Sequence, residues 1–100
     1  MKAYILRDRM NFYAYDCGEF VIGVYKDMSK AQDKLGELWS NTKKEVSEFY
    51  KDELDFDLTI TDKVVEPNRC VFTTNFPFEV KGKLYGETYE VWIEEEIVEE

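Results

Sequence analysis

A single apolar stripe of helical period runs through the middle of this chain. Its members follow one another at intervals of three or four residues and are Ala31, Leu35, Leu38, Thr42, Val46 and Phe49. Residues at this spacing lie on one face of an α-helix, and that face must be buried against another layer. Ser29 and Gln32 form a capping-box pattern, which predicts a helix from about residue 29 to about residue 53. Gly36 and the Ser40-Asn41-Thr42 run permit a kink, but the stripe keeps its phase across them, which favours one long helix.

On both sides of this helix the apolar pattern alternates every second residue, which indicates β-strands. The expected strands are residues 2–8, 19–26, 57–65 and 69–76, followed by a hairpin over 78–98 that turns at Lys81-Gly82-Lys83. Gly23, inside the second strand, predicts a bulge or the close approach of another element. We therefore expect one α+β domain over residues 1–100. It would have an antiparallel sheet of about five strands in the order ββαβββ, with the helix packed on one face.

The charges of the chain are unevenly placed. The net charge is −9, and residues 1–50 contain eight Lys/Arg and eight Asp/Glu. Residues 51–100 contain five Lys/Arg and fourteen Asp/Glu, so this half carries all of the excess negative charge. Such a surface repels nucleic acid and anionic membranes. It suits a protein partner with a basic surface.

Several classes of function lack the residues they need. The chain has no histidine, which removes the commonest general base and the commonest metal ligand. Cys17 and Cys70 are far apart and match no metal spacing, so we expect reduced thiols. Asp55 and Asp57 begin a spacing that resembles a calcium loop, but Ile60 stands where that loop needs glycine. We expect no enzyme activity, no cofactor and no metal.

The location predicted from the sequence is the cytoplasm. No apolar run approaches the ~20 residues that a membrane helix needs. The residues after Met1 are polar and charged, so we expect no signal peptide.

The acidic end of the chain, "EVWIEEEIVEE", is the main candidate for a binding surface. Alternation places Glu90, Trp92, Glu94 and Glu96 on one face, with side chains two apart separated by ~6.8 Å. One interpretation is that the glutamates protect an exposed edge strand and keep the chain soluble. The other is that they present spaced negative charge to a basic protein surface, as a DNA mimic does. The residues assigned to this partner-binding surface are Glu90, Trp92, Glu94, Glu95, Glu96, Asp55 and Asp57.

Two other functions stay open. Aromatic residues in the connection over residues 9–20 could stack on a small molecule or nucleotide, with neighbouring arginines pairing to a phosphate. The residues assigned to this alternative site are Arg7, Arg9, Phe12, Tyr13 and Tyr15. A third alternative is a structural or assembly protein.

Three segments carry a resemblance to a known class of proteins. They are the opening "MKAYIL", the segment "GVYKDMSKAQDKLGEL" and the acidic "YEVWIEEEIVEE". Together they resemble small uncharacterised proteins of bacteriophages and mobile elements, a class that includes anti-CRISPR-like inhibitors of host defence. The resemblance implies a protein of the bacterial cytoplasm that binds and blocks a host protein, and in this setting the structural alternative would be a part of a phage particle. The negative charge predicts no direct contact with nucleic acid or membrane. An exposed sheet edge could support strand pairing between copies, so we expect a monomer or a weak homodimer. The resemblance carries over no functional residue.

Overall fold

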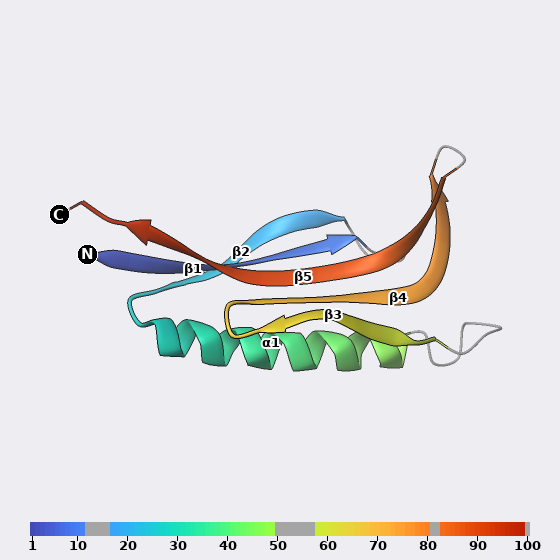
Figure 1. Ribbon diagram of the computed structural model, residues 1–100, viewed down its shortest axis with the longest axis horizontal. Helices are drawn as coiled ribbons and strands as arrows, with labels where there is room; N and C mark the ends of the chain where they lie inside the picture. The colour runs from blue at the N-terminus through green and yellow to red at the C-terminus, as the bar shows by residue number, and fades with distance from the viewer. Residues whose placement is uncertain (12–16, 50–57, 81–82, 100) are drawn as a thin grey trace.

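The fold is an antiparallel sheet with one helix across one of its faces (Figure 1). A computed structural model describes residues 1–11, 17–49, 58–80 and 83–99, without side-chain detail at 76–80 and 83–86. The elements are β1 (Lys2–Asn11), β2 (Gly18–Tyr25), α1 (Met28–Phe49), β3 (Ile60–Glu66), β4 (Arg69–Val80) and β5 (Lys83–Ile97). All neighbouring strands are antiparallel. The predicted α+β class and the order ββαβββ are confirmed.

The strand order is β2-β1-β5-β4-β3, so β5 is the central strand and β2 and β3 are the edges. The interpretation of the last strand as an exposed edge is therefore wrong. Val91 of β5 lies opposite Asp8 of β1 on one side and opposite Cys70 of β4 on the other. The glutamates of β5 are compatible with a central position because the helix buries only one face of this antiparallel sheet.

The core lies between α1 and the inner face of β1, β4 and β5. It is formed by the buried side chains Leu6, Leu35, Trp39, Val46, Cys70, Phe72, Tyr89 and Val91. Three aromatic rings meet at its centre, with centroids separated by 5.3 Å for Trp39–Phe72, 5.4 Å for Phe72–Tyr89 and 6.5 Å for Trp39–Tyr89. The first two pairs are tilted and the third is stacked, and both arrangements are favourable for aromatic pairs at such distances. Along the predicted stripe, Leu38 is only half-buried and Phe49 is exposed, and Trp39 takes the central position instead.

The helix begins at Met28, and its N-cap lies two residues before Ser29 of the capping-box pattern. Oδ1 of Asp27 accepts hydrogen bonds from the backbone N–H of Ser29 (2.9 Å) and from its hydroxyl (2.8 Å). Asp27 is therefore the N-cap, and the prediction that placed the cap at Ser29 is wrong. Gln32 instead donates from Nε2 to Oδ1 of Asn68 at 2.7 Å, tying the first turn of α1 to the β3–β4 turn.

The helix is continuous through Gly36, as the unbroken phase of the stripe predicts. It is described as far as Phe49. Its predicted continuation to residue 53 falls outside the described residues.

A bulge interrupts the pairing of β1 with β2. The register passes from Leu6 opposite Gly23 to Arg7 opposite Val21, which leaves Ile22 as an extra residue on β2. This confirms the bulge predicted from Gly23. A Cβ at Gly23 would come within 3.0 Å of the Tyr25 ring, so the glycine leaves room for that aromatic side chain. Because of the extra residue, Val21 and Val24 both lie on the face of the sheet away from the helix.

Candidate partner-binding face of the sheet

The face of the sheet away from α1 is called here the open face. Alternation along β1, β5, β4 and β2 places on it Ile5, Arg7, Arg9, Glu90, Trp92, Glu94, Glu96, Arg69, Val71, Val21 and Val24. As the spacing predicts, the residues Glu90, Trp92, Glu94 and Glu96 lie on one face. Their immediate surroundings are not purely acidic, because arginines of β1 and β4 lie beside them.

Trp92 occupies the middle of the open face. Arg7 lies directly opposite it on β1, and Arg69 lies directly opposite it on β4. Its indole Nε1 donates a hydrogen bond of 3.0 Å to Oε1 of Glu94. The guanidinium of Arg9 lies 5.2 Å from the centroid of the indole ring, a cation–π distance. The half-buried indole thus has a fixed orientation and a polar surround.

A chain of ion pairs crosses four neighbouring strands beside Trp92. Arg9 of β1 pairs with Glu19 of β2 at 2.9 Å and with Glu90 of β5 at 3.5 Å. Glu90 pairs in turn with Arg69 of β4 at 2.7 Å. Each of these solvent-exposed pairs contributes at most about 1 kcal/mol to stability. Their main effect is to fix where positive and negative groups stand on the open face.

Ion pairs also change the charge that the acidic row of β5, formed by Glu90, Glu94 and Glu96, presents to solvent. Arg7 pairs with Glu94 at 3.0 Å, and the hydrogen bond from Trp92 together with this arginine lowers the pKa of the Glu94 carboxyl. Lys2 pairs with Glu95 at 2.7 Å, and this pairing raises the pKa of the lysine. Among the described residues no ion pair involves Glu96. The row therefore offers one unpaired carboxylate at its end and paired ones elsewhere.

The remaining partner-binding candidates, Asp55 and Asp57, lie outside the described residues. The arginine partners were not anticipated from the sequence. The signal for them is the period-two spacing of Arg7 and Arg9, which puts both on the face that carries the glutamates once β1 and β5 are neighbours.

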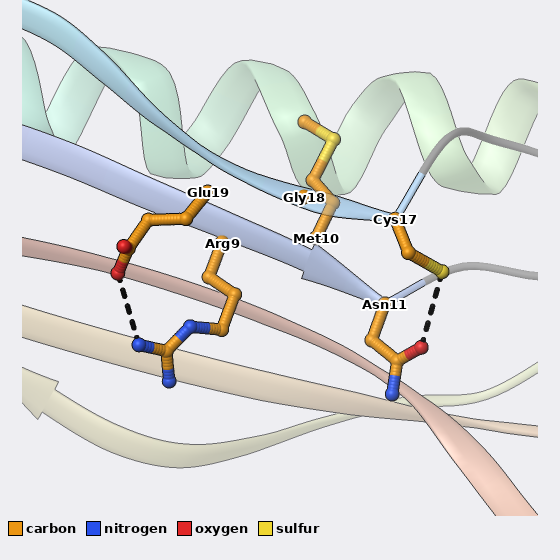
Figure 2. A pocket seen from close by; sticks show the side chains of 6 residues that line it. All are labelled: Arg9, Met10, Asn11, Cys17, Gly18 and Glu19. Carbon is orange, nitrogen blue, oxygen red and sulfur yellow. Dashed lines mark hydrogen bonds and ion pairs between the residues drawn. The ribbon is translucent and has the colours of Figure 1, made fainter.

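A hollow of about 380 Å³ lies at the end of the β1–β2 hairpin (Figure 2). It is lined by Arg9, Met10, Asn11, Cys17, Gly18 and Glu19. In Figure 2 the guanidinium of Arg9 points to Glu19, and the thiol of Cys17 donates to Oδ1 of Asn11 at 3.3 Å. Of the residues assigned to the alternative ligand site, Arg9 lines the hollow and Arg7 lies two residues away on β1. Phe12, Tyr13 and Tyr15 lie outside the described residues.

A second hollow, of about 410 Å³, lies between α1 and the β3–β4 turn, beside Leu35, Gly36, Trp39, Val65 and Cys70. Cys17 and Cys70 are both free thiols, the first exposed and the second buried. Within the described ranges no group of three or more Cys, Asp or Glu is placed to hold a metal ion. In the same ranges, no helix has the length and apolar character needed to cross a membrane.

Two carboxyl groups, those of Asp8 and Glu87, are buried, and sequence reasoning missed them as a feature. Asp8 is 2% exposed, and among the described residues its Oδ1 has no hydrogen-bond partner. Burial raises the pKa of Asp8, against the lowering effect of its hydrogen bond with Tyr89. Burial also raises the pKa of Tyr89. Glu87, fully buried, accepts a hydrogen bond of 3.0 Å from the hydroxyl of Thr74.

The geometry of the described residues is the evidence on function, because comparison with known proteins gives no match. No family model, no curated protein and no solved structure matches this chain.

Proposed function

We propose that this chain is a non-enzymatic binding protein that blocks a partner protein by covering it with the open face of the sheet. The observation that carries the proposal is the position of Trp92 on the central strand, held between Arg7 and Arg69 on the face that α1 does not cover. Tryptophan and arginine are the residues most enriched among those that dominate binding energy at protein interfaces. A pre-oriented indole ringed by charged groups supports binding to a protein surface.

The partner in this proposal has a basic surface. The net charge of −9 attracts such a surface over distance and speeds its encounter with this chain. On contact, Glu96 and the acidic end of β5 face the partner's lysines and arginines. Because Glu90 and Glu94 already pair with arginines of the chain itself, the surface is unlike a continuous row of DNA phosphates. In this proposal, charge brings the partners together and Trp92 makes the close contact.

The biological setting in this proposal comes from the resemblance to small phage and mobile-element proteins. It is the cytoplasm of a bacterial host, where the partner would be a nucleic-acid-handling defence protein. Such proteins have the basic surfaces that bind phosphates. An anti-defence inhibitor of this kind acts by occupying that surface.

The test is affinity capture from a bacterial lysate with the full chain immobilised and a salt gradient for elution. One bait is wild type, and one carries Glu94→Gln, Glu95→Gln and Glu96→Gln. The matched control carries Glu37→Gln, Glu45→Gln and Glu48→Gln on α1, which change the net charge by the same amount away from β5. We expect a nucleic-acid-handling protein that elutes early from wild type, is retained by the α1 control and is lost with the β5 variant.

A fourth bait, Trp92→Ala, tests the contact residue independently of charge. We expect it to lose the same partner while keeping its fold by circular dichroism. If the α1 control and the β5 variant lost the partner equally, binding would depend on net charge alone, which would contradict a defined site. Recovery of the partner by Trp92→Ala at wild-type affinity would contradict the role of the open face.

A second candidate function is favoured by the hollow at the β1–β2 end. Its lining includes the guanidinium of Arg9 and the amide of Asn11, which suit a small anionic ligand such as a nucleotide. A thermal-shift screen with nucleotides tests it, using Arg9→Met and, as control, Arg69→Met. Stabilisation of wild type and Arg69→Met, but not of Arg9→Met, would support this function. No stabilisation of wild type by any nucleotide would exclude these ligands.

A further inference from the structure

The two edge strands of the sheet differ in how they are protected. The edge strand β3 carries Asp62, Lys63 and Glu66, and Pro67 follows it directly. Charges and proline on an edge discourage pairing with another chain. The other edge, β2, has no charged residue between Glu19 and Lys26.

Edge strand β2 also exposes a run of large apolar side chains. The exposed fractions are 49% for Phe20, 54% for Val21, 38% for Ile22 and 63% for Val24. In the described part of the chain, no strand pairs with the outer edge of β2. An apolar edge strand with free backbone N–H and C=O groups is a template for pairing with another strand. β2 is therefore the side of the molecule best suited to strand addition.

We propose that β2 pairs antiparallel with β2 of a second copy of this chain, so that two five-stranded sheets become one continuous sheet. The contact is isologous, because the same strand contributes from both copies about a two-fold axis. Both α1 helices then lie on the same side of the joined sheet. The glutamates of β5 do not oppose this contact, since β1 separates β5 from β2 in each copy.

The faces of β2 select the register of this pairing. Residues directly opposite each other in an antiparallel pair lie on the same face of the sheet. Val21 and Val24 both lie on the open face, opposite Arg7 and Ile5 of β1. A register with Val21 opposite Val24 of the second copy keeps open-face residues together. A shift by one residue would place Val21 opposite Gly23 or Tyr25, which face the helix side.

The same register also places the other residues of β2 opposite residues of the same face. Phe20 then lies opposite Tyr25 of the second copy, and both are on the helix side because they pair with Asp8 and Tyr4 of β1. Ile22 of each copy then lies opposite Gly23 of the other, on either side of the symmetry axis. Both strands carry an extra residue at this point, so the pairs on both sides of the axis keep their register.

Charges at the two ends of the strand are complementary in this register. Glu19 lies opposite Lys26 of the second copy, and by symmetry this pair forms twice. Opposite charges at facing positions stabilise a strand pair, whereas like charges destabilise it. The apolar centre with one acidic and one basic end identifies a second copy of this chain as the occupant.

Sedimentation equilibrium of the full chain over a range of concentrations tests the dimer. We expect wild type to pass from a mass of 11.9 kDa to twice that value as concentration rises. The variant Val21→Lys with Val24→Lys places lysines opposite one another, and its dimer dissociation constant should rise by at least about ten-fold. The matched control, Thr61→Lys with Val65→Lys on β3, adds the same charge to the other edge and should dimerise like wild type.

A charge exchange tests the register without altering the apolar residues. It is made in an Arg9→Met background, which removes the ion pair between Arg9 and Glu19 of the same copy. Glu19→Lys alone faces Lys26 of the second copy, and Lys26→Glu alone faces Glu19, so each should weaken the dimer. The double variant Glu19→Lys with Lys26→Glu restores opposite charges and should restore dimerisation at unchanged net charge. Circular dichroism verifies that each variant is folded. A wild type that stays monomeric at millimolar concentration, a dimer insensitive to the Val21/Val24 variant, or a double variant that fails to recover would overturn the proposal.

Discussion

The hydroxyl of Tyr89 donates a hydrogen bond of 3.0 Å to Oδ2 of Asp8 in the core beneath α1. This joins a residue of β1 to one of β5 across two neighbouring strands of the sheet. The other carboxylate oxygen of Asp8 is buried without a hydrogen-bond partner in the part of the chain that the structure describes. An acid in this position is costly as an anion and tolerable when protonated.

Asp8 should make the stability of the fold depend on pH. Because burial raises the pKa of Asp8 in the folded state, its contribution is fully present below the unfolded pKa of about 3.9 and is lost as pH rises through the folded value. We expect the unfolding free energy of wild type, relative to Asp8→Asn, to fall between pH 4 and 7 as the buried carboxyl loses its proton. Urea denaturation at both pH values measures this. A difference that stays constant with pH would contradict a raised pKa for Asp8.

The hydrogen bond from the Tyr89 hydroxyl should contribute more to the unfolding free energy than the hydroxyl of an ordinary tyrosine does. Tyr89→Phe leaves the Asp8 carboxylate buried with no donor, which we expect to cost about 1–3 kcal/mol at neutral pH. The loss should shrink at pH 4, where Asp8 is more protonated. The matched control is Tyr25→Phe, a half-buried tyrosine of β2. Equal losses in the two variants would show that Asp8 does not depend on Tyr89.

Substitution of Trp39 should lower mainly stability, whereas substitution of Trp92 should lower mainly partner binding. Trp39 is buried and contacts Phe72 and Tyr89, so Trp39→Ala should cost about 3–5 kcal/mol. Trp92 lies half-buried on the open face, and Trp92→Ala should cost about 1 kcal/mol. Urea denaturation followed by circular dichroism compares them. A Trp92 variant as unstable as the Trp39 variant would assign Trp92 to the fold and remove the argument for a binding residue.

The helix cap should require the acceptor at residue 27. The pKa of Asp27 is lowered, chiefly by its hydrogen bonds from Ser29. A lowered pKa gives stability that is present above the unfolded pKa of about 3.9 and is lost as pH falls through the folded value. Asp27→Ala should lower Tm at neutral pH, and Asp27→Asn, an equally good N-cap, should lower it less. Asp33→Ala, an exposed acid inside α1, is the control. Identical Tm values for the Ala and Asn variants at residue 27 would show that the side chain does not cap α1.

The ion-pair chain on the open face should contribute little to folding. Arg9 and Glu90 are 3.5 Å apart, and the arginine side chain is largely exposed. A double-mutant cycle with Arg9→Met and Glu90→Gln should give a coupling energy below about 1 kcal/mol. Thermal or urea unfolding of the four proteins measures it. A coupling well above that value would make the chain of pairs a structural element of the sheet.

The periodic patterns predict which residues share a face, but not which strands are neighbours. Alternation places Glu90 and Trp92 together, and the helical stripe selects the buried side of α1. Strand order depends on how the whole chain closes its core, which no local pattern contains. For this reason β5 was misplaced at an edge and the arginines that pair with Glu90 were not anticipated.

Smaller differences have local causes. Asp27 and Ser29 are both good N-caps, and two residues so close are nearly equivalent by propensity. The burial of Asp8 follows from its alternation with Leu6, although an aspartate alone suggests the surface. Here the period of the strand outweighed the polarity of the side chain.

The central position of β5 has a consequence for how the protein is made. The hairpins β1–β2 and β3–β4 share no strand pairing with each other, and only β5 joins them. During synthesis they remain two separate half-sheets until residues 83–97 have left the ribosome. Until then, the inner edges of β1 and β4 are unpaired, and the apolar side chains that Val91 and Tyr89 will cover stay uncovered. The nascent chain therefore passes through an interval in which unpaired strands can associate with other molecules.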